Sequence, residues 1–186
     1  MKQHLAPSAL ILWLLCPGVV SGRAAKESAA PVSLRPLTFA QWQQKLAGYR
    51  GQVVIVDFWA TWCAPCLERF PHMVSLYQKY GSRGNVRFVS ISLDDREDPE
   101  ALQRASDFLK RQKAEFENYR MDEIVPDAFE KLNLLGIPAV FIYDRAGQLR
   151  YRLTGDDPNR QFSNEDVDAA IKSLSARTPA NSRSRK

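Results

Sequence analysis

The chain has 186 residues, of which 45% are hydrophobic and 25% charged, and its formal net charge is +5. This length suits one domain with a sizeable core and leaves no room for a second enzymatic domain. Three of the basic residues lie in the last five positions, 182–186, and the others are interleaved with acidic residues. We therefore expect no nucleic-acid partner, and at most a weak attraction to an anionic membrane surface.

Residues 1–22 have the layout of a secretory signal peptide. A lysine at position 2 precedes an apolar stretch that ends in the small residues Ser21 and Gly22. Cleavage after Gly22 would remove Cys16. The apolar stretch is shorter than the ~20 residues needed to span a bilayer and contains a proline, so cleavage is favoured over the alternative of a retained anchor.

Three further segments follow the predicted signal peptide. Residues 23–36 are rich in alanine, serine, proline and charge without hydrophobic periodicity, which predicts a flexible leader. The folded domain is expected over residues 37–175, and residues 176–186 are expected to form a disordered basic tail. The domain should open with a helix that Thr38 caps and that ends at Gly48.

An apolar, β-branched run at residues 52–58 predicts a buried strand that leads into two cysteines three positions apart, Cys63 and Cys66. Two thiols at this spacing can lie on the first turn of a helix, where unpaired N–H groups and the helix dipole stabilise a thiolate. Pro65 suits that turn because it donates no N–H. We therefore predict a helix over 64–80, with Cys63 as the nucleophile and Cys66 as the resolving cysteine.

Zinc sites and passive disulfides use the same cysteine spacing. A structural zinc needs about four ligands, and outside the pair the sequence offers only Cys16, His4 and His72. A disulfide between such close neighbours closes too short a loop to add much stability. A redox-active pair is therefore favoured, and neither a metal nor another cofactor is expected.

The remainder of the chain predicts alternating strands and helices of an α/β fold. Acidic residues at 94–100 suit the beginning of a helix. The expected elements are a parallel strand at 86–93, a helix at 99–112, a short strand at 116–121, a helix at 125–132, a hairpin of strands at 139–143 and 148–153, and a last helix at 163–174.

The segment Val-Asp-Phe-Trp-Ala-Thr-Trp-Cys-Ala-Pro-Cys, residues 56–66, resembles the active-site strand and turn of the thioredoxin superfamily. The sequence of this segment is most similar to that of the exported TlpA/ResA-like thiol:disulfide oxidoreductases. Pro71 stands where thioredoxins kink the active-site helix, and residues 136–139, Gly-Ile-Pro-Ala, resemble the loop that carries the family's cis-proline. The resemblance implies a thioredoxin fold, with a central mixed β-sheet flanked by helices. The long interval from Leu93 to Pro138 resembles the βα-type insertion of the TlpA/ResA-like branch, which precedes the cis-proline loop.

The same resemblance assigns a role to Asp57, which matches the buried aspartate that family members place beneath the second cysteine. Because this carboxyl lies in an apolar strand, its pKa is expected to be raised toward the range in which it can accept the proton of Cys66. The alternative is a capped or solvent-reaching aspartate without a role. Many exported relatives carry asparagine or another neutral residue there, which implies that such a carboxyl assists the step and is not indispensable to it.

A substrate-binding surface is also implied around the nucleophile. It would consist of Trp62, Ala64, Pro65, Ile137 and Pro138. Trp62 would form an apolar platform, and Ile137, before a cis-proline, would offer backbone groups to an extended substrate. The dipeptide between the cysteines lacks the histidine of strongly oxidising members, which favours a reductant.

The sequence thus predicts an exported thiol:disulfide oxidoreductase, in the bacterial periplasm or on the outer face of the cytoplasmic membrane. Expected partners are protein disulfides or dithiols and a membrane-bound electron donor, and the resemblance suggests apocytochrome c as one substrate. A disulfide oxidase or isomerase is the alternative within this class. A thioredoxin-fold binding module that leaves the cysteines unused is the alternative outside it.

Overall fold

The computed structural model describes residues 31–81, 84–155 and 161–176. The predicted signal peptide and nearly all of the predicted tail lie outside these residues. In chain order the elements are β1 (Leu34–Leu37), α1 (Phe39–Gly48), β2 (Val53–Trp59), α2 (Ala64–Tyr80), β3 (Val86–Ser92), α3 (Pro99–Gln112), β4 (Glu117–Met121), α4 (Val125–Lys131), β5 (Ala139–Tyr143), β6 (Leu149–Thr154) and α5 (Asn164–Ser175). None of the described helices is long and apolar enough to cross a membrane.

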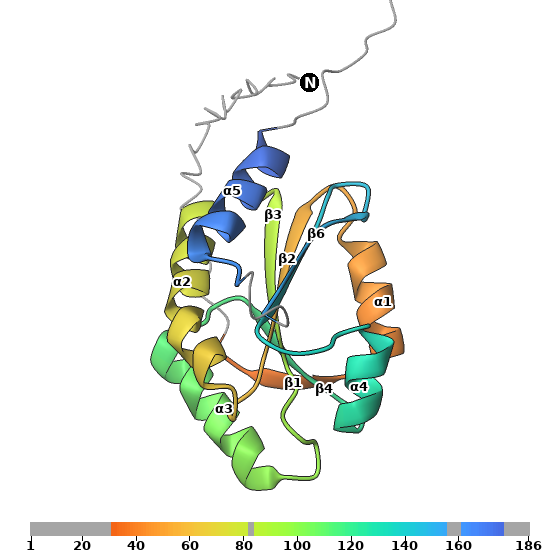
Figure 1. Cartoon of the computed structure of the whole chain (residues 1–186), viewed down its shortest axis with the longest axis vertical. Coiled ribbons are helices and arrows are strands. Elements are labelled where there is room, and N and C mark those ends of the chain that lie inside the picture. The colour runs from red at the N-terminus through yellow and green to blue at the C-terminus, as the bar shows by residue number, and fades with distance from the viewer. Residues whose placement is uncertain (1–30, 82–83, 156–160, 177–186) are drawn as a thin grey trace, which may run out of the picture.

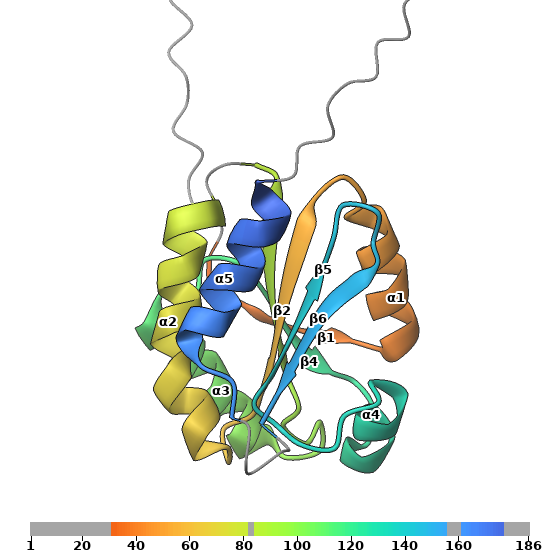
Figure 2. The same cartoon turned by 45° about the horizontal axis from the view of Figure 1, so that its top comes forward.

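One mixed sheet of six strands forms the centre of the fold, in the order β1-β4-β3-β2-β5-β6. Helices α2, α3 and α5 lie on one face of this sheet, and α1 and α4 lie on the other (Figures 1 and 2). The strand β2 runs parallel to β3 and antiparallel to β5. All seven residues of β2 are buried, because a central strand covered by helices on both faces contacts no solvent. This burial explains the continuous apolar run in the sequence.

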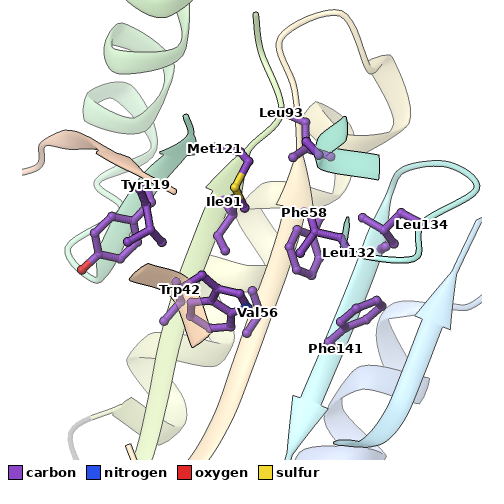
Figure 3. Close-up of a cluster of buried hydrophobic side chains, with 14 of the residues drawn as sticks. Trp42, Val56, Phe58, Ile91, Leu93, Tyr119, Met121, Leu132, Leu134 and Phe141 are labelled. Carbon is purple, nitrogen blue, oxygen red and sulfur yellow. The ribbon is translucent and has the colours of Figure 1, made fainter. Parts of the chain in front are cut away.

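Side chains of β2 point alternately to the two faces of the sheet. Val56 and Phe58 join the core beneath α1 and α4, together with Trp42 of α1 (Figure 3). Val53 and Ile55 join the core beneath α2 and α5. The alternation therefore directs Asp57 toward the face on which α2 begins.

The order and type of every element expected between residues 38 and 175 are confirmed, with ends that agree within one residue. Thr38 forms the expected N-cap, since its hydroxyl accepts a hydrogen bond from the backbone N–H of Gln41. The prediction of a flexible leader is wrong for residues 34–36. They belong to β1, which pairs in parallel with β4 and is anchored by apolar contacts of Leu34 and Leu37 with two core clusters. A four-residue edge strand is too short to produce a recognisable period in the sequence.

The predicted insertion corresponds to α3 and β4, which lie between β3 and α4. Strand β4 widens the sheet by pairing between β3 and β1. Helix α3 packs against the beginning of α2, where the ring of Phe108 lies 5.2 Å from that of Trp59 and 5.1 Å from that of Phe70, measured between centroids. The insertion therefore covers the end of the sheet at which the cysteines lie.

Candidate active site

The two cysteines lie where β2 ends and α2 begins. Cys63 is the N-cap of α2 and Cys66 is its third residue, with Ala64 and Pro65 between them. The two sulfur atoms form a disulfide, with 5.3 Å between the Cα atoms. Cys63 is 5% exposed and Cys66 1%, so the first cysteine is the more accessible of the two. A thiolate at the N-cap lies beside the positive end of the helix dipole.

Asp57 lies on β2 two residues before Trp59, so the two side chains point to the same face of the sheet. The side chain of Asp57 is 3% exposed. Its neighbours across the sheet are Ser90 on β3 and Val140 on β5. Burial raises the pKa of the Asp57 carboxyl to about 6, and the nearby charge of Arg69 offsets part of that rise. A raised pKa agrees with the expectation from the sequence.

Arg69 is a site residue that the sequence analysis missed. Its Nη1 lies 3.6 Å from Oδ1 of Asp57, and its side chain is 14% exposed. The guanidinium carbon lies 4.2 Å from the centre of the Phe162 ring, just before α5. The spacing of three residues from Cys66 on one helix could have revealed this position, since such residues are neighbours on the helix surface.

A second buried carboxylate, Asp94, holds the turn that carries the nucleophile. It is 1% exposed and accepts hydrogen bonds from the backbone N–H of Thr61 at 3.0 Å and from the Thr61 hydroxyl at 2.6 Å. The hydroxyl of Ser92 donates to its other oxygen at 2.7 Å. Sequence analysis grouped Asp94 with the acids at the beginning of a helix, but the cap of α3 is Asp98. Asp94 instead fixes the turn two residues before Cys63.

The five residues expected to bind substrate lie on two segments. Trp62 is 58% exposed, and Ala64 and Pro65 are exposed beside the disulfide. The bond between Ile137 and Pro138 is cis, and Ile137 packs against the core cluster that contains both cysteines. No other residue in the described part of the chain makes a hydrogen bond with the backbone N–H or C=O of Ile137.

Within the described ranges, no group of three or more histidine, cysteine or acidic residues could hold a metal ion. The described site contains a disulfide, a buried carboxyl with its arginine, and an exposed surface around the first cysteine. In its reduced form such a cysteine pair supplies both the electrons and the nucleophile of disulfide exchange.

The AhpC/TSA family pattern matches residues 24–152. The chain belongs to the AhpC/TSA family. Within this thioredoxin-superfamily group it is 26% identical to the thiol-disulfide oxidoreductase ResA of Geobacillus kaustophilus, over 71% of this chain and 68% of the relative. It is 24% identical to ResA of Bacillus thuringiensis, over 87% of this chain and 94% of the relative.

Solved structures of thiol:disulfide interchange proteins are also similar to this chain. The putative thiol:disulfide interchange protein DsbE from Chlorobium tepidum is 28% identical with a TM-score of 0.55, and the match covers 69% of this chain and 84% of that one. A thioredoxin-family thiol:disulfide interchange protein from the same organism matches with a TM-score of 0.53, also at 28% identity, over 69% and 83% of the two chains. The predicted thioredoxin fold is confirmed, and the protein is a thiol:disulfide oxidoreductase.

The first prediction concerns the stability contributed by Asp57. The pKa of its carboxyl is about 6 in the folded chain, above the ordinary value of 3.8. The folded chain therefore binds this proton more tightly than the unfolded chain does. The contribution of this group to the free energy of unfolding therefore falls by about 2 kcal/mol as the pH rises from about 4 to about 7. Asp57→Asn should abolish that fall. The measurement is urea unfolding of both oxidised proteins across this range; a constant difference between them would contradict the raised pKa.

The second prediction concerns Asp94. Asp94→Asn should lower the free energy of unfolding by about 2 kcal/mol, because it weakens charge-assisted hydrogen bonds to a buried group. Asp95→Asn is the matched control, since Asp95 is the neighbouring carboxylate and is exposed. Its change should stay within about 0.5 kcal/mol. Equal losses in the two variants, measured by denaturant unfolding at neutral pH, would show that Asp94 does not hold the turn.

Proposed function

We propose that this protein is an exported reductant of disulfides in other exported proteins. The observation that carries the proposal is the disulfide between Cys63 and Cys66 at the beginning of α2. The layout of residues 1–22 supports export. Removal of that segment would leave no cysteine except this pair, so the mature chain would have no other disulfide to form.

In the proposed reaction the Cys63 thiolate attacks one sulfur of a substrate disulfide. A mixed disulfide forms and the first substrate thiolate leaves. Asp57 then accepts the proton of the Cys66 thiol, and the Cys66 thiolate attacks the sulfur of Cys63. The second substrate thiolate leaves, so the substrate has gained two electrons and the enzyme has become oxidised. The buried position of Asp57 and its raised pKa support this proton transfer.

The substrate in this proposal is an extended polypeptide segment. Trp62 offers it an exposed aromatic surface next to the nucleophile. The backbone groups of Ile137, which have no hydrogen-bond partner among the described residues, can form strand-like hydrogen bonds with it. Pro138 has no N–H of its own, and its C=O already accepts a hydrogen bond from Gly155.

The proposed direction of electron flow is from this protein to its substrates. The Ala64-Pro65 dipeptide, without a histidine beside Cys66, supports a reductant. A reductant in an oxidising compartment must itself be re-reduced, so we include a membrane-bound electron donor as a partner. The similarity to proteins named thiol-disulfide oxidoreductase and thiol:disulfide interchange protein supports protein disulfides as the substrate class. We include the disulfide of apocytochrome c as a specific candidate.

The test is capture of the mixed disulfide. Cys66→Ser should accumulate covalent, thiol-reversible adducts with exported proteins, because the resolving thiol is absent. Cys63→Ser is the matched control and should capture about a tenth as much or less, since it lacks the nucleophile. The adducts are counted on non-reducing gels after acid quenching. Equal capture by the two variants, or none by either, would contradict the proposal and favour a binding module.

A further inference from the structure

We infer that Arg69 is a positioning residue of the resolving step: its guanidinium stays beside the negative charge that passes from the Asp57 carboxylate to the Cys66 sulfur. This inference rests on the roles proposed above for Asp57 and Cys66. It adds a third group to the proton transfer and places that group on the same helix as the two cysteines.

The contact between Arg69 and Asp57 is an ion pair without a hydrogen bond. The distance of 3.6 Å between Nη1 and Oδ1 lies beyond ordinary hydrogen-bond length. Nη1 is buried and has no hydrogen-bond partner in the described part of the chain. Leaving a charged donor unpaired in this way is costly. A second, transient hydrogen-bond partner would explain why Nη1 of Arg69 is left unpaired.

The sulfur of Cys66 can be that second partner. It precedes Arg69 by three positions on α2, and residues at this spacing have Cβ atoms about 5–6 Å apart. The ring of Phe162 lies over the guanidinium at 4.2 Å, and the same guanidinium lies 3.6 Å from the Asp57 carboxyl. Arg69 thus contacts the proton acceptor and lies about one helical turn from the proton donor.

The movement of charge during resolution of the mixed disulfide explains why a cation at position 69 affects this step. Before resolution Asp57 is a carboxylate, Cys66 is a thiol and Arg69 is a cation. The proton moves from the Cys66 sulfur to Asp57, and the negative charge moves to the sulfur at the same moment. Arg69 contacts Asp57 and lies three residues from Cys66 on α2, so in this inference the buried cation keeps an anionic neighbour until the sulfur forms its bond with Cys63. The carboxyl later returns its proton to solvent.

Arg69 also keeps the acceptor available near neutral pH. Burial raises the pKa of Asp57 and the charge of Arg69 lowers it. The neighbours of Asp57 on β3 and β5, Ser90 and Val140, carry no charge. The side chains that α5 packs onto this face of the sheet are apolar: Val167, Ala170 and Ile171. Among the described residues, Arg69 is the charged group recorded next to Asp57.

The test follows the two chemical steps separately with the chromogenic disulfide dithionitrobenzoate. Attack by Cys63 on this probe releases one coloured thiolate, and resolution by Cys66 releases the second. In the wild-type protein the second phase should slow as the pH falls below about 6, where Asp57 becomes protonated. In Arg69→Gln this decline should begin about one pH unit higher or more, because an opposite charge at this distance typically shifts a carboxyl pKa by about 1–3.

Near pH 6 the Arg69→Gln variant should therefore resolve the mixed disulfide at least about fivefold more slowly, with the first phase within about twofold of wild type. Arg69→Lys keeps the charge and should recover most of the rate. Lys79→Gln is the matched control, since it removes a cation from the other end of α2, where Lys79 pairs with Asp168. It should leave both phases unchanged. Arg69→Met replaces the glutamine variant if the latter does not fold.

A wild-type pH profile in Arg69→Gln, or an effect on the first phase alone, would overturn the inference. Asp57→Asn separates this failure from failure of the proposed function. If Asp57→Asn itself leaves the profile of the second phase unchanged, the proposed role of Asp57 is wrong. If Asp57→Asn alters the profile and Arg69→Gln does not, the inference about Arg69 alone is wrong.

Discussion

Asp57 occupies a strand whose seven residues are all buried, and the carboxyl can be ionised there only with a compensating charge. Moving an unpaired carboxylate into such surroundings costs several kcal/mol. Arg69 supplies the compensation from the helix that begins with the cysteines. The pair thereby joins the central strand to the active-site helix, in addition to the apolar contacts between these two elements.

The two buried carboxylates near the site differ in their hydrogen bonds. Asp94 accepts hydrogen bonds from Thr61 and Ser92, so its negative charge is satisfied and its effect is to fix the turn. The Asp57 carboxyl accepts no hydrogen bond from the described part of the chain and has only the ion pair with Arg69. A carboxyl with few partners can change its protonation state at low cost. The same residue type therefore fixes a turn at one position, and at the other it has the surroundings that the proposed proton transfer requires.

Local patterns in the sequence predicted most of the fold. The apolar run of β2, the cysteine spacing and the proline-containing loop at 136–139 are each complete within a few residues, so they could be recognised without tertiary contacts. The contacts of Asp94 and Arg69 are not complete within a local pattern, although the spacing of Arg69 from Cys66 marks its position on the helix. The contact between Asp94 and Thr61 joins residues 33 positions apart, and an arginine on a helix is usually solvent-exposed. Burial of its charge depends on a partner that only the folded sheet supplies.

The equilibrium reduction potential of the Cys63–Cys66 pair tests the proposed reductant most directly. It can be measured in glutathione or dithiothreitol buffers through the fluorescence of Trp59 and Trp62, which flank the turn that carries the pair. The account predicts a value near that of thioredoxin, about −270 mV. A value between about −120 and −180 mV, where oxidants and isomerases lie, would contradict it.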